Sequence, residues 1–188
     1  LCLIACDLGN SRTEEALEIR TRVANALDIP VVNVMFNLSH NHSAADLPTM
    51  LRGNAEDTEI ARSENYFEYV IDQAVLAATT AQSQLRPARM AHAWGESDLN
   101  IYRREWDGNQ DVLGEVPGHP TDKTVGVIRF DDLEGNPIAI LFRFSCHPVV
   151  NGAQSPTLSA DFPGPARKII EKNVGGTALF LQIGRAHV

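Results

Sequence analysis

Two histidines, His40 and His42, stand two positions apart, shortly after an apolar, β-branched run from Val31 to Phe36. In an extended segment, residues two apart point to the same side. The spacing therefore predicts that both imidazoles reach one spot at the carboxyl end of a strand, where α/β sheets usually bind ligands. Neutral imidazole is a ligand that zinc favours, so the pair indicates a divalent-metal site. The alternative is a polar loop with two solvated histidines.

Two further polar clusters, Arg103-Arg104 and His147, follow strand-like runs elsewhere in the chain. Imidazoles from separate strand ends can converge on one ion, and a catalytic zinc needs about three protein ligands plus water. Arg103 and Arg104 would face opposite sides of an extended segment, so only one of them can face a metal. The plainer alternatives are that His147, before Pro148, simply ends a strand, and that Arg103 forms a surface ion pair with Glu105 or Asp107.

A β-α-β unit over residues 1–38 is predicted to position the histidine pair. Leu1 to Leu8 has the pattern of a buried strand, and Ser11 and Glu14 have the spacing of a capping box. Apolar residues then recur at helical spacing, and Pro30 follows the predicted helix end: Ala16, Ile19, Val23 and Leu27. Two strands joined by a helix favour a parallel pair and an α/β fold.

The remaining pattern predicts further helices and strands around a mixed sheet. A loop is expected over 44–57, followed by a long helix over 62–85 and a strand over 90–94; the buried face of the helix is expected to hold Tyr66, Tyr69, Val70, Ala74 and Ala77. An excursion over 107–123 is expected to contain a solvated His119. The rest of the chain predicts a hairpin of strands 125–130 and 138–145 around residues 134–137, then a helix over 161–172 and a buried strand over 177–182. The predicted fold class is α/β: a mixed β-sheet flanked by helices, in an incomplete domain.

Composition narrows the class of protein. The 188 residues carry a net charge of −8 without a block of like charges, which disfavours a nucleic-acid partner. No apolar run approaches the ~18 residues of a membrane span. Cys2 and Cys6 would lie about 13 Å apart on a strand, too far to bridge, and Cys146 is expected to be a packed free thiol.

Both ends of the chain suggest an internal fragment. Leu1 begins inside a strand-like run, and the last six residues, 183–188, match the translation of a widely used sequencing adapter. We therefore expect residues 1–182 to be a partial domain and 183–188, including His187, to be a non-native tail without a functional role.

Six segments, in order, resemble motifs of the neutral (non-lysosomal) ceramidases. The segment Ser39-His-Asn-His-Ser43 resembles the family's H-T-H-S-G motif. The others are Ala5-Cys-Asp7, Asn100-Ile-Tyr-Arg-Arg104, Phe144-Ser-Cys-His-Pro148, Ser159-Ala-Asp-Phe-Pro-Gly164 and Ala178-Leu-Phe-Leu-Gln182. The resemblance covers essentially all of residues 1–182.

The resemblance implies a zinc-dependent N-acyl amidohydrolase with His40 and His147 as zinc ligands. It implies that His42 and Arg103 line the site and contact the reacting amide or its oxyanion. The substrate would be a ceramide-like lipid, reached at a membrane surface and cleaved to a fatty acid and a sphingoid base.

Parts of the family pattern differ or lie outside this chain. Ala44 stands where the family has Gly, and Tyr102 stands where it has Asn. The family's serine nucleophile and its Glu and Tyr zinc ligands lie beyond Gln182, so this chain alone is expected to be inactive. Two alternatives stay open: a hydrolase of the same family that acts on another amide or ester, and a non-catalytic module that binds a small ligand without metal.

Overall fold

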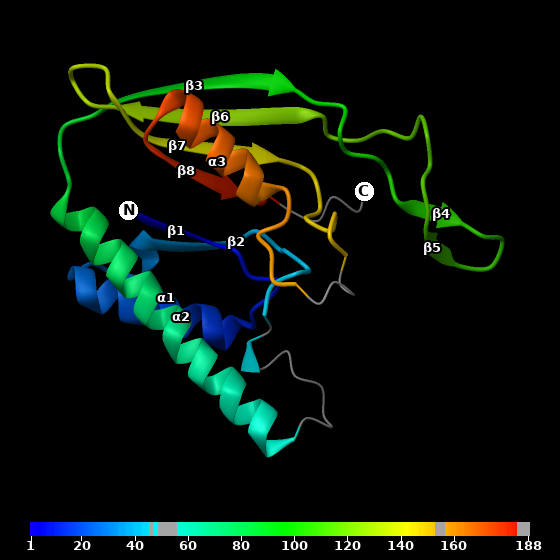
Figure 1. The fold of residues 1–188 in the computed structure, drawn as a ribbon, viewed down its shortest axis with the longest axis horizontal. Helices are drawn as coiled ribbons and strands as arrows, with labels where there is room; N and C mark the ends of the chain where they lie inside the picture. Colours follow the sequence, from blue (N-terminus) through cyan, green and yellow to red (C-terminus); the bar gives the residue numbers. More distant parts are fainter. Residues whose placement is uncertain (46, 49–55, 153–156, 184–188) are drawn as a thin grey trace. The chain divides into compact units, whose positions relative to one another are not determined.

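The computed structural model describes residues 1–45, 47–48, 56–152 and 157–183 (Figure 1). The chain divides into two compact units. Unit 1 comprises Leu1–Pro87 and Asn151–Asp161, and unit 2 comprises Ala88–Val150 and Phe162–Val188. The predicted fold class is confirmed, because helices flank strands that include a mixed sheet. The predicted non-native tail lies, from residue 184 on, outside the described residues, as does most of the predicted loop at 49–55.

Unit 1 contains the predicted β-α-β unit. Strand β1 (Cys2–Cys6) pairs in parallel with β2 (Val34–Leu38), and helix α1 (Thr13–Leu27) connects them. The apolar run after Pro30 is predicted to form one buried strand, and this prediction is wrong. Its first residues form a 3₁₀ turn, η1 (Val31–Asn33), in which the Asn33 amide donates to the Pro30 carbonyl. Proline, with φ of −60°, favours this turn, and Val32 is left 79% exposed.

Helix α1 begins one residue later than the predicted capping box. The Arg12 amide donates to the Glu15 carboxylate at 2.9 Å, so Glu15, which is buried, takes the position assigned to Glu14. Arg20 then ties the helix to the next strand, since its Nε donates to the Val34 carbonyl at 2.8 Å. The helix ends at Asp28, whose φ of 54° is left-handed.

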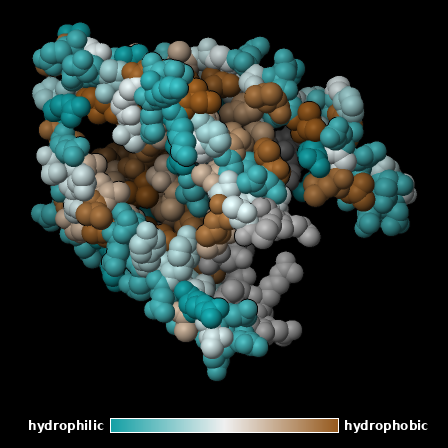
Figure 2. Space-filling view, in the orientation of Figure 1, coloured by the Kyte–Doolittle hydropathy of each residue, from teal (hydrophilic) through white to brown (hydrophobic). Residues whose placement is uncertain are grey.

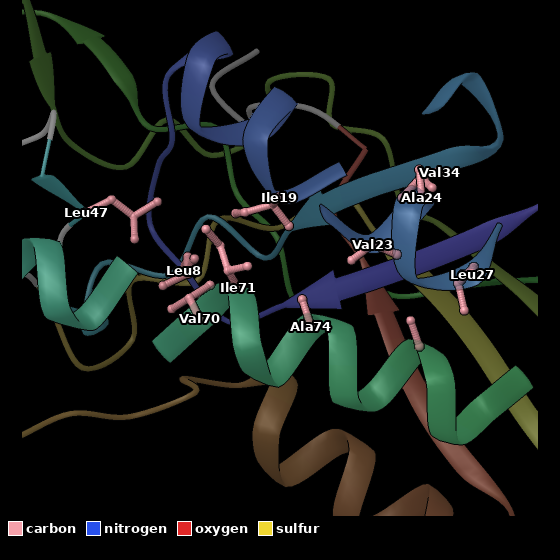
Figure 3. Close-up of a cluster of buried hydrophobic side chains, with 11 residues drawn as sticks. Leu8, Ile19, Val23, Ala24, Leu27, Val34, Leu47, Val70, Ile71 and Ala74 are labelled. Atoms are coloured by element: carbon pink, nitrogen blue, oxygen red, sulfur yellow. The ribbon is translucent and has the colours of Figure 1, made fainter. Parts of the chain in front are cut away.

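Helix α2 (Asp57–Ser83) covers the same core as α1 (Figure 3). Figure 3 shows Val70, Ile71 and Ala74 of α2 directed toward the side chains of α1 and of the strands. The predicted buried face is partly wrong, because Tyr69 is 57% exposed and Ala77 also faces solvent. Val70 and Ala74 are buried as predicted, and Ile71 and Ala78 take the places assigned to Tyr69 and Ala77.

Unit 2 is built on a four-stranded mixed sheet with the order β3-β6-β7-β8. Strands β3 (Arg89–Glu96), β6 (Thr124–Asp131) and β7 (Pro137–Phe144) are antiparallel, and β8 (Thr177–Leu181) is parallel to β7. Helix α3 (Pro163–Val174) packs through Ala166 and Ile170 against Phe142, Phe144 and Phe180. The predicted hairpin is confirmed.

Strands β4 (Arg104–Trp106) and β5 (Asp111–Leu113) pair into a two-stranded ribbon. Only β5 lies within the excursion predicted over 107–123, and β4 directly precedes it. Both strands are short, which is why alternation alone did not reveal them. Hydrophobic side chains are visible on the surface of this ribbon (Figure 2), where Trp106 and Leu113 are 64% and 66% exposed.

The three cysteines are free thiols, as expected. Among the described residues, none of the helices combines the length and the apolar character that a membrane span requires.

Candidate metal centre

The backbone of unit 1 holds His40 in one orientation and one tautomer. Strand β2 ends at Leu38, and His40 turns the chain with a left-handed φ of 59°, which few residues other than glycine adopt. Its Nδ1 lies 2.7 Å from the Gly9 carbonyl oxygen. Because a carbonyl only accepts, Nδ1 donates in this contact, and in the neutral imidazole Nε2 is then the ring nitrogen that can act as a metal ligand. Metal-binding histidines are typically held by such a second hydrogen bond, so His40 fits a metal.

Asn41 holds the turn in which both histidines lie. It is 1% exposed, and its Oδ1 accepts a hydrogen bond from the Ser43 amide at 2.8 Å, which is the pattern of an Asx turn. Its Nδ2 donates to the Ser159 carbonyl, and its backbone amide donates to the Leu8 carbonyl at 3.3 Å. The turn is therefore fixed to the end of β1 and to the segment that contains Ser159.

His42 lies beside His40 within the same turn. The two ring centroids are 5.1 Å apart with their planes at 86°, and a nitrogen of each ring lies within 4.8 Å of the other. The predicted proximity of the pair is therefore present in unit 1. The predicted reason is wrong, since a left-handed residue and an Asx turn bring the rings together, not an extended strand. His42 is exposed and His40 is half-buried.

His147 belongs to unit 2 and follows strand β7 after Ser145 and Cys146. It is 9% exposed. Two backbone hydrogen bonds of 2.9 Å shape the segment: the Cys146 amide donates to the Phe144 carbonyl, and the Val149 amide donates to the His147 carbonyl. His147 therefore lies just beyond the end of β7, which is Phe144, and not within the strand. That His147 and His40 bind the same ion stays a prediction, because each is described within its own unit.

Arg103 also lies in unit 2, but it precedes β4 instead of following a strand. Its Nε donates to the Gly114 carbonyl at 2.5 Å, and the Gly114 amide donates back to the Arg103 carbonyl at 3.0 Å. Its partner is thus a backbone carbonyl at the end of the ribbon and not the Glu105 carboxylate of the alternative interpretation. Arg104 is the first residue of β4.

Sequence reasoning missed a polar network beside the end of β7. Asn100 donates from Nδ2 to the carbonyl oxygens of Asp122 and Ser145, both at 2.7 Å. Asp122 accepts from the Ser145 hydroxyl at 2.7 Å and from Arg143 at 3.0 Å. Hydrogen bonds from Thr124, Ser145 and Arg143 hold the pKa of the Asp122 carboxyl well below its ordinary value. The sequence offered only a weak signal for this network, because Asp122 lies two residues before β6, and aspartate is common at such turn positions.

The known proteins described below, to which this chain is similar in sequence or structure, are all ceramidases. No family model matches the chain. Neutral ceramidase A from Dictyostelium discoideum is 29% identical over 149 residues, which are 77% of this chain and 20% of the relative. Neutral ceramidase B from the same organism is 27% identical over 149 residues, with the same coverage. The chain therefore spans about a fifth of the length of the curated relatives it matches.

Solved structures agree with the sequence relatives. A ceramidase described as complexed with C2 has a TM-score of 0.71 and 22% identity, covering 97% of this chain and 29% of that protein. Neutral ceramidase from Pseudomonas aeruginosa has a TM-score of 0.65 and 22% identity, covering 89% of this chain and 28% of that protein. The resemblance to the neutral ceramidase family is thus confirmed over part of those proteins, together with the fold.

Proposed function

We propose that this chain forms part of a zinc-dependent amidohydrolase that cleaves the N-acyl bond of ceramide-like lipids. The products would be a fatty acid and a sphingoid base. The observation that carries the proposal is the His40 side chain, whose Nδ1 is held by the Gly9 carbonyl, as one ring nitrogen of a metal-binding histidine typically is. The similarity to neutral ceramidases supports the choice of reaction.

We assign His40 and His147 as two of the zinc ligands. Both are imidazoles that follow a strand end, and imidazole nitrogen is a preferred zinc ligand. When bound, zinc supplies Lewis acidity at the carbonyl of the scissile amide. Two ligands do not complete a zinc site, so the proposal requires at least one more ligand from the rest of the polypeptide.

We assign His42 and Arg103 to the reacting groups themselves. His42 is exposed beside His40, and an imidazole there can hold or deliver a proton at the amide nitrogen as that nitrogen leaves. Arg103 uses Nε to hold Gly114, so its terminal Nη groups are the donors that we assign to the negative charge on the acyl oxygen. The substrate would be a lipid taken from a membrane surface.

The test uses the full-length polypeptide that carries this chain. It is incubated with a long-chain N-acylsphingosine and, separately, with a short N-acyl amine, and both products are quantified. We expect fatty acid and amine to appear in equal amounts from the long-chain lipid, to stop when zinc is removed and to resume when zinc is restored.

Matched variants connect the activity to the assigned residues. His40→Ala and His147→Ala should each lower the zinc content and the activity. His92→Ala should change neither, because His92 is an exposed histidine on β3. Cleavage of only the short amide would support the same-family hydrolase with another substrate. Ligand binding without zinc and without turnover would refute the enzymatic proposal.

A further inference from the structure

We infer that Asn100 and Asp122 are positioning residues that clamp the end of strand β7 and thereby set the placement of His147. The inference rests on the proposed function in one respect, the role of His147 as a zinc ligand. Its structural part, that these two side chains fix the segment after β7, stands on contacts within unit 2 alone.

The clamp begins with the Asn100 side-chain amide, which joins two segments distant in sequence. Its nitrogen donates one hydrogen to the Asp122 carbonyl, 22 positions away, and one to the Ser145 carbonyl, 45 positions away. Two carbonyl acceptors leave no freedom to exchange the amide oxygen and nitrogen. Asn100 is 8% exposed, and its Oδ1 is buried without a hydrogen-bond partner among the described residues. An unsatisfied buried acceptor is costly, so the amide is held there by its two donor bonds.

Asp122 secures the same strand end through side chains. One carboxylate oxygen accepts from the Ser145 hydroxyl and from Arg143, while the other accepts from the Thr124 amide at 3.0 Å. Ser145 is therefore held by its carbonyl through Asn100 and by its hydroxyl through Asp122. His147 is only two residues further along the chain, so little backbone freedom separates the clamp from the imidazole.

The sheet itself directs Arg143 into the clamp. Trp94, Gly126 and Arg143 are in register on the adjacent strands β3, β6 and β7. The guanidinium carbon of Arg143 lies 5.1 Å from the centroid of the Trp94 ring. A Cβ at Gly126 would lie 2.6 Å from the Trp94 ring and 3.0 Å from Arg143 Cγ, so only glycine allows this approach. The stacked arginine can then reach Asp122.

A matched control exists at the other end of the same hairpin. Asp132 accepts hydrogen bonds from the amides of Glu134 and Asn136, much as Asp122 accepts one from Thr124. Removing the Asp132 carboxylate takes hydrogen bonds from the turn between β6 and β7, whereas removing the Asp122 carboxylate takes them from Thr124 of β6, Arg143 of β7 and Ser145. Only Asp122 lies beside the segment that leads to His147.

The experiment compares Asn100→Ala, Asp122→Ala and Asp132→Ala in the full-length protein, with two measurements. Zinc affinity is measured by competitive titration, and hydrogen exchange of the Val149 amide is measured in the metal-free protein, because that amide donates to the His147 carbonyl. Both clamp variants should weaken zinc binding about 10- to 100-fold, as the loss of an orienting partner does. They should also speed Val149 exchange by about fivefold or more. Asp132→Ala should change neither.

The two measurements separate the inference from the function. If the unmodified protein binds no zinc, the proposed function fails, and the Val149 exchange rates alone decide whether the clamp exists. If zinc binds and both clamp variants keep unchanged affinity and unchanged Val149 exchange, the inference is wrong. Faster exchange with unchanged zinc affinity would show a structural clamp without a role in placing His147, and would also overturn it.

Discussion

Replacing Asn41 with alanine should destabilise unit 1 and weaken metal binding together. The asparagine side chain makes two hydrogen bonds, accepting from the Ser43 amide and donating to the Ser159 carbonyl. Alanine leaves both partners without this bond. An unsatisfied buried group costs about 1–3 kcal/mol. Ser43 is 5% exposed and should approach the upper end, whereas Ser159 is only half-buried and should lie near the lower end. We expect a loss of about 2–4 kcal/mol in the free energy of unfolding.

The same substitution releases the turn that orients His40. Without the Asx bond, the left-handed conformation at His40 loses a constraint that maintains it. The bond between its Nδ1 and the Gly9 carbonyl should then be populated for less of the time. We expect zinc affinity to fall about 10- to 100-fold, which corresponds to about 1.4–2.8 kcal/mol.

The assay is urea denaturation of the metal-free protein, followed by competitive zinc titration. Two controls bracket the result. Asn65→Ala alters an exposed asparagine of α2 and should change stability by less than about 0.5 kcal/mol. Ser43→Ala removes only the 3.3 Å hydroxyl bond to the Gly152 carbonyl and keeps the Asx bond, so zinc affinity should be retained. If Asn41→Ala costs no more stability than Asn65→Ala, the two bonds are not made. If it is destabilising but binds zinc normally, the turn does not position His40.

Three further outcomes are expected from single substitutions. If the full-length protein has the proposed activity, Arg103→Ala should lower kcat by ~10²-fold and Arg104→Ala should have little effect. Equal losses in steady-state kinetics would contradict the assignment of Arg103. Gly9→Ala should weaken zinc binding by about tenfold in a titration. The added Cβ would lie 3.0 Å from the Asn41 carbonyl oxygen and would displace the residue 9 carbonyl, which holds His40. An unchanged Kd would refute this. The folded-state pKa of Asp122 is lowered, so its stabilising contribution is present above its unfolded pKa of ~3.9 and is lost as the pH falls through the folded value. Urea midpoints measured between about pH 5 and pH 2 should therefore fall less steeply in Asp122→Asn than in the unmodified protein, and parallel curves would refute the linkage.

Local patterns in the sequence determined the elements that carry the site. Ile19, Val23 and Leu27 repeat at the helical period, and the same residues form the buried face of α1. The turn residues between β6 and β7 likewise predicted the hairpin that ends near His147. These features depend on neighbours a few positions away, and a single sequence displays such neighbours directly. The histidines were recognisable for a similar reason, since each stands beside the end of an apolar run.

Tertiary structure decided how those histidines are held. The contact between His40 and the Gly9 carbonyl joins residues 31 positions apart, and the bond from Asn41 to the Ser159 carbonyl joins residues 118 apart. The Asn100 side-chain amide donates to the carbonyls of two residues that lie 22 and 45 positions further along the chain. Each of these bonds ends on a backbone carbonyl, a group that every residue has and that no residue type reveals in the sequence. A side-chain pattern carries no record of such partners, because only the folded path of the backbone brings a particular carbonyl within hydrogen-bond distance.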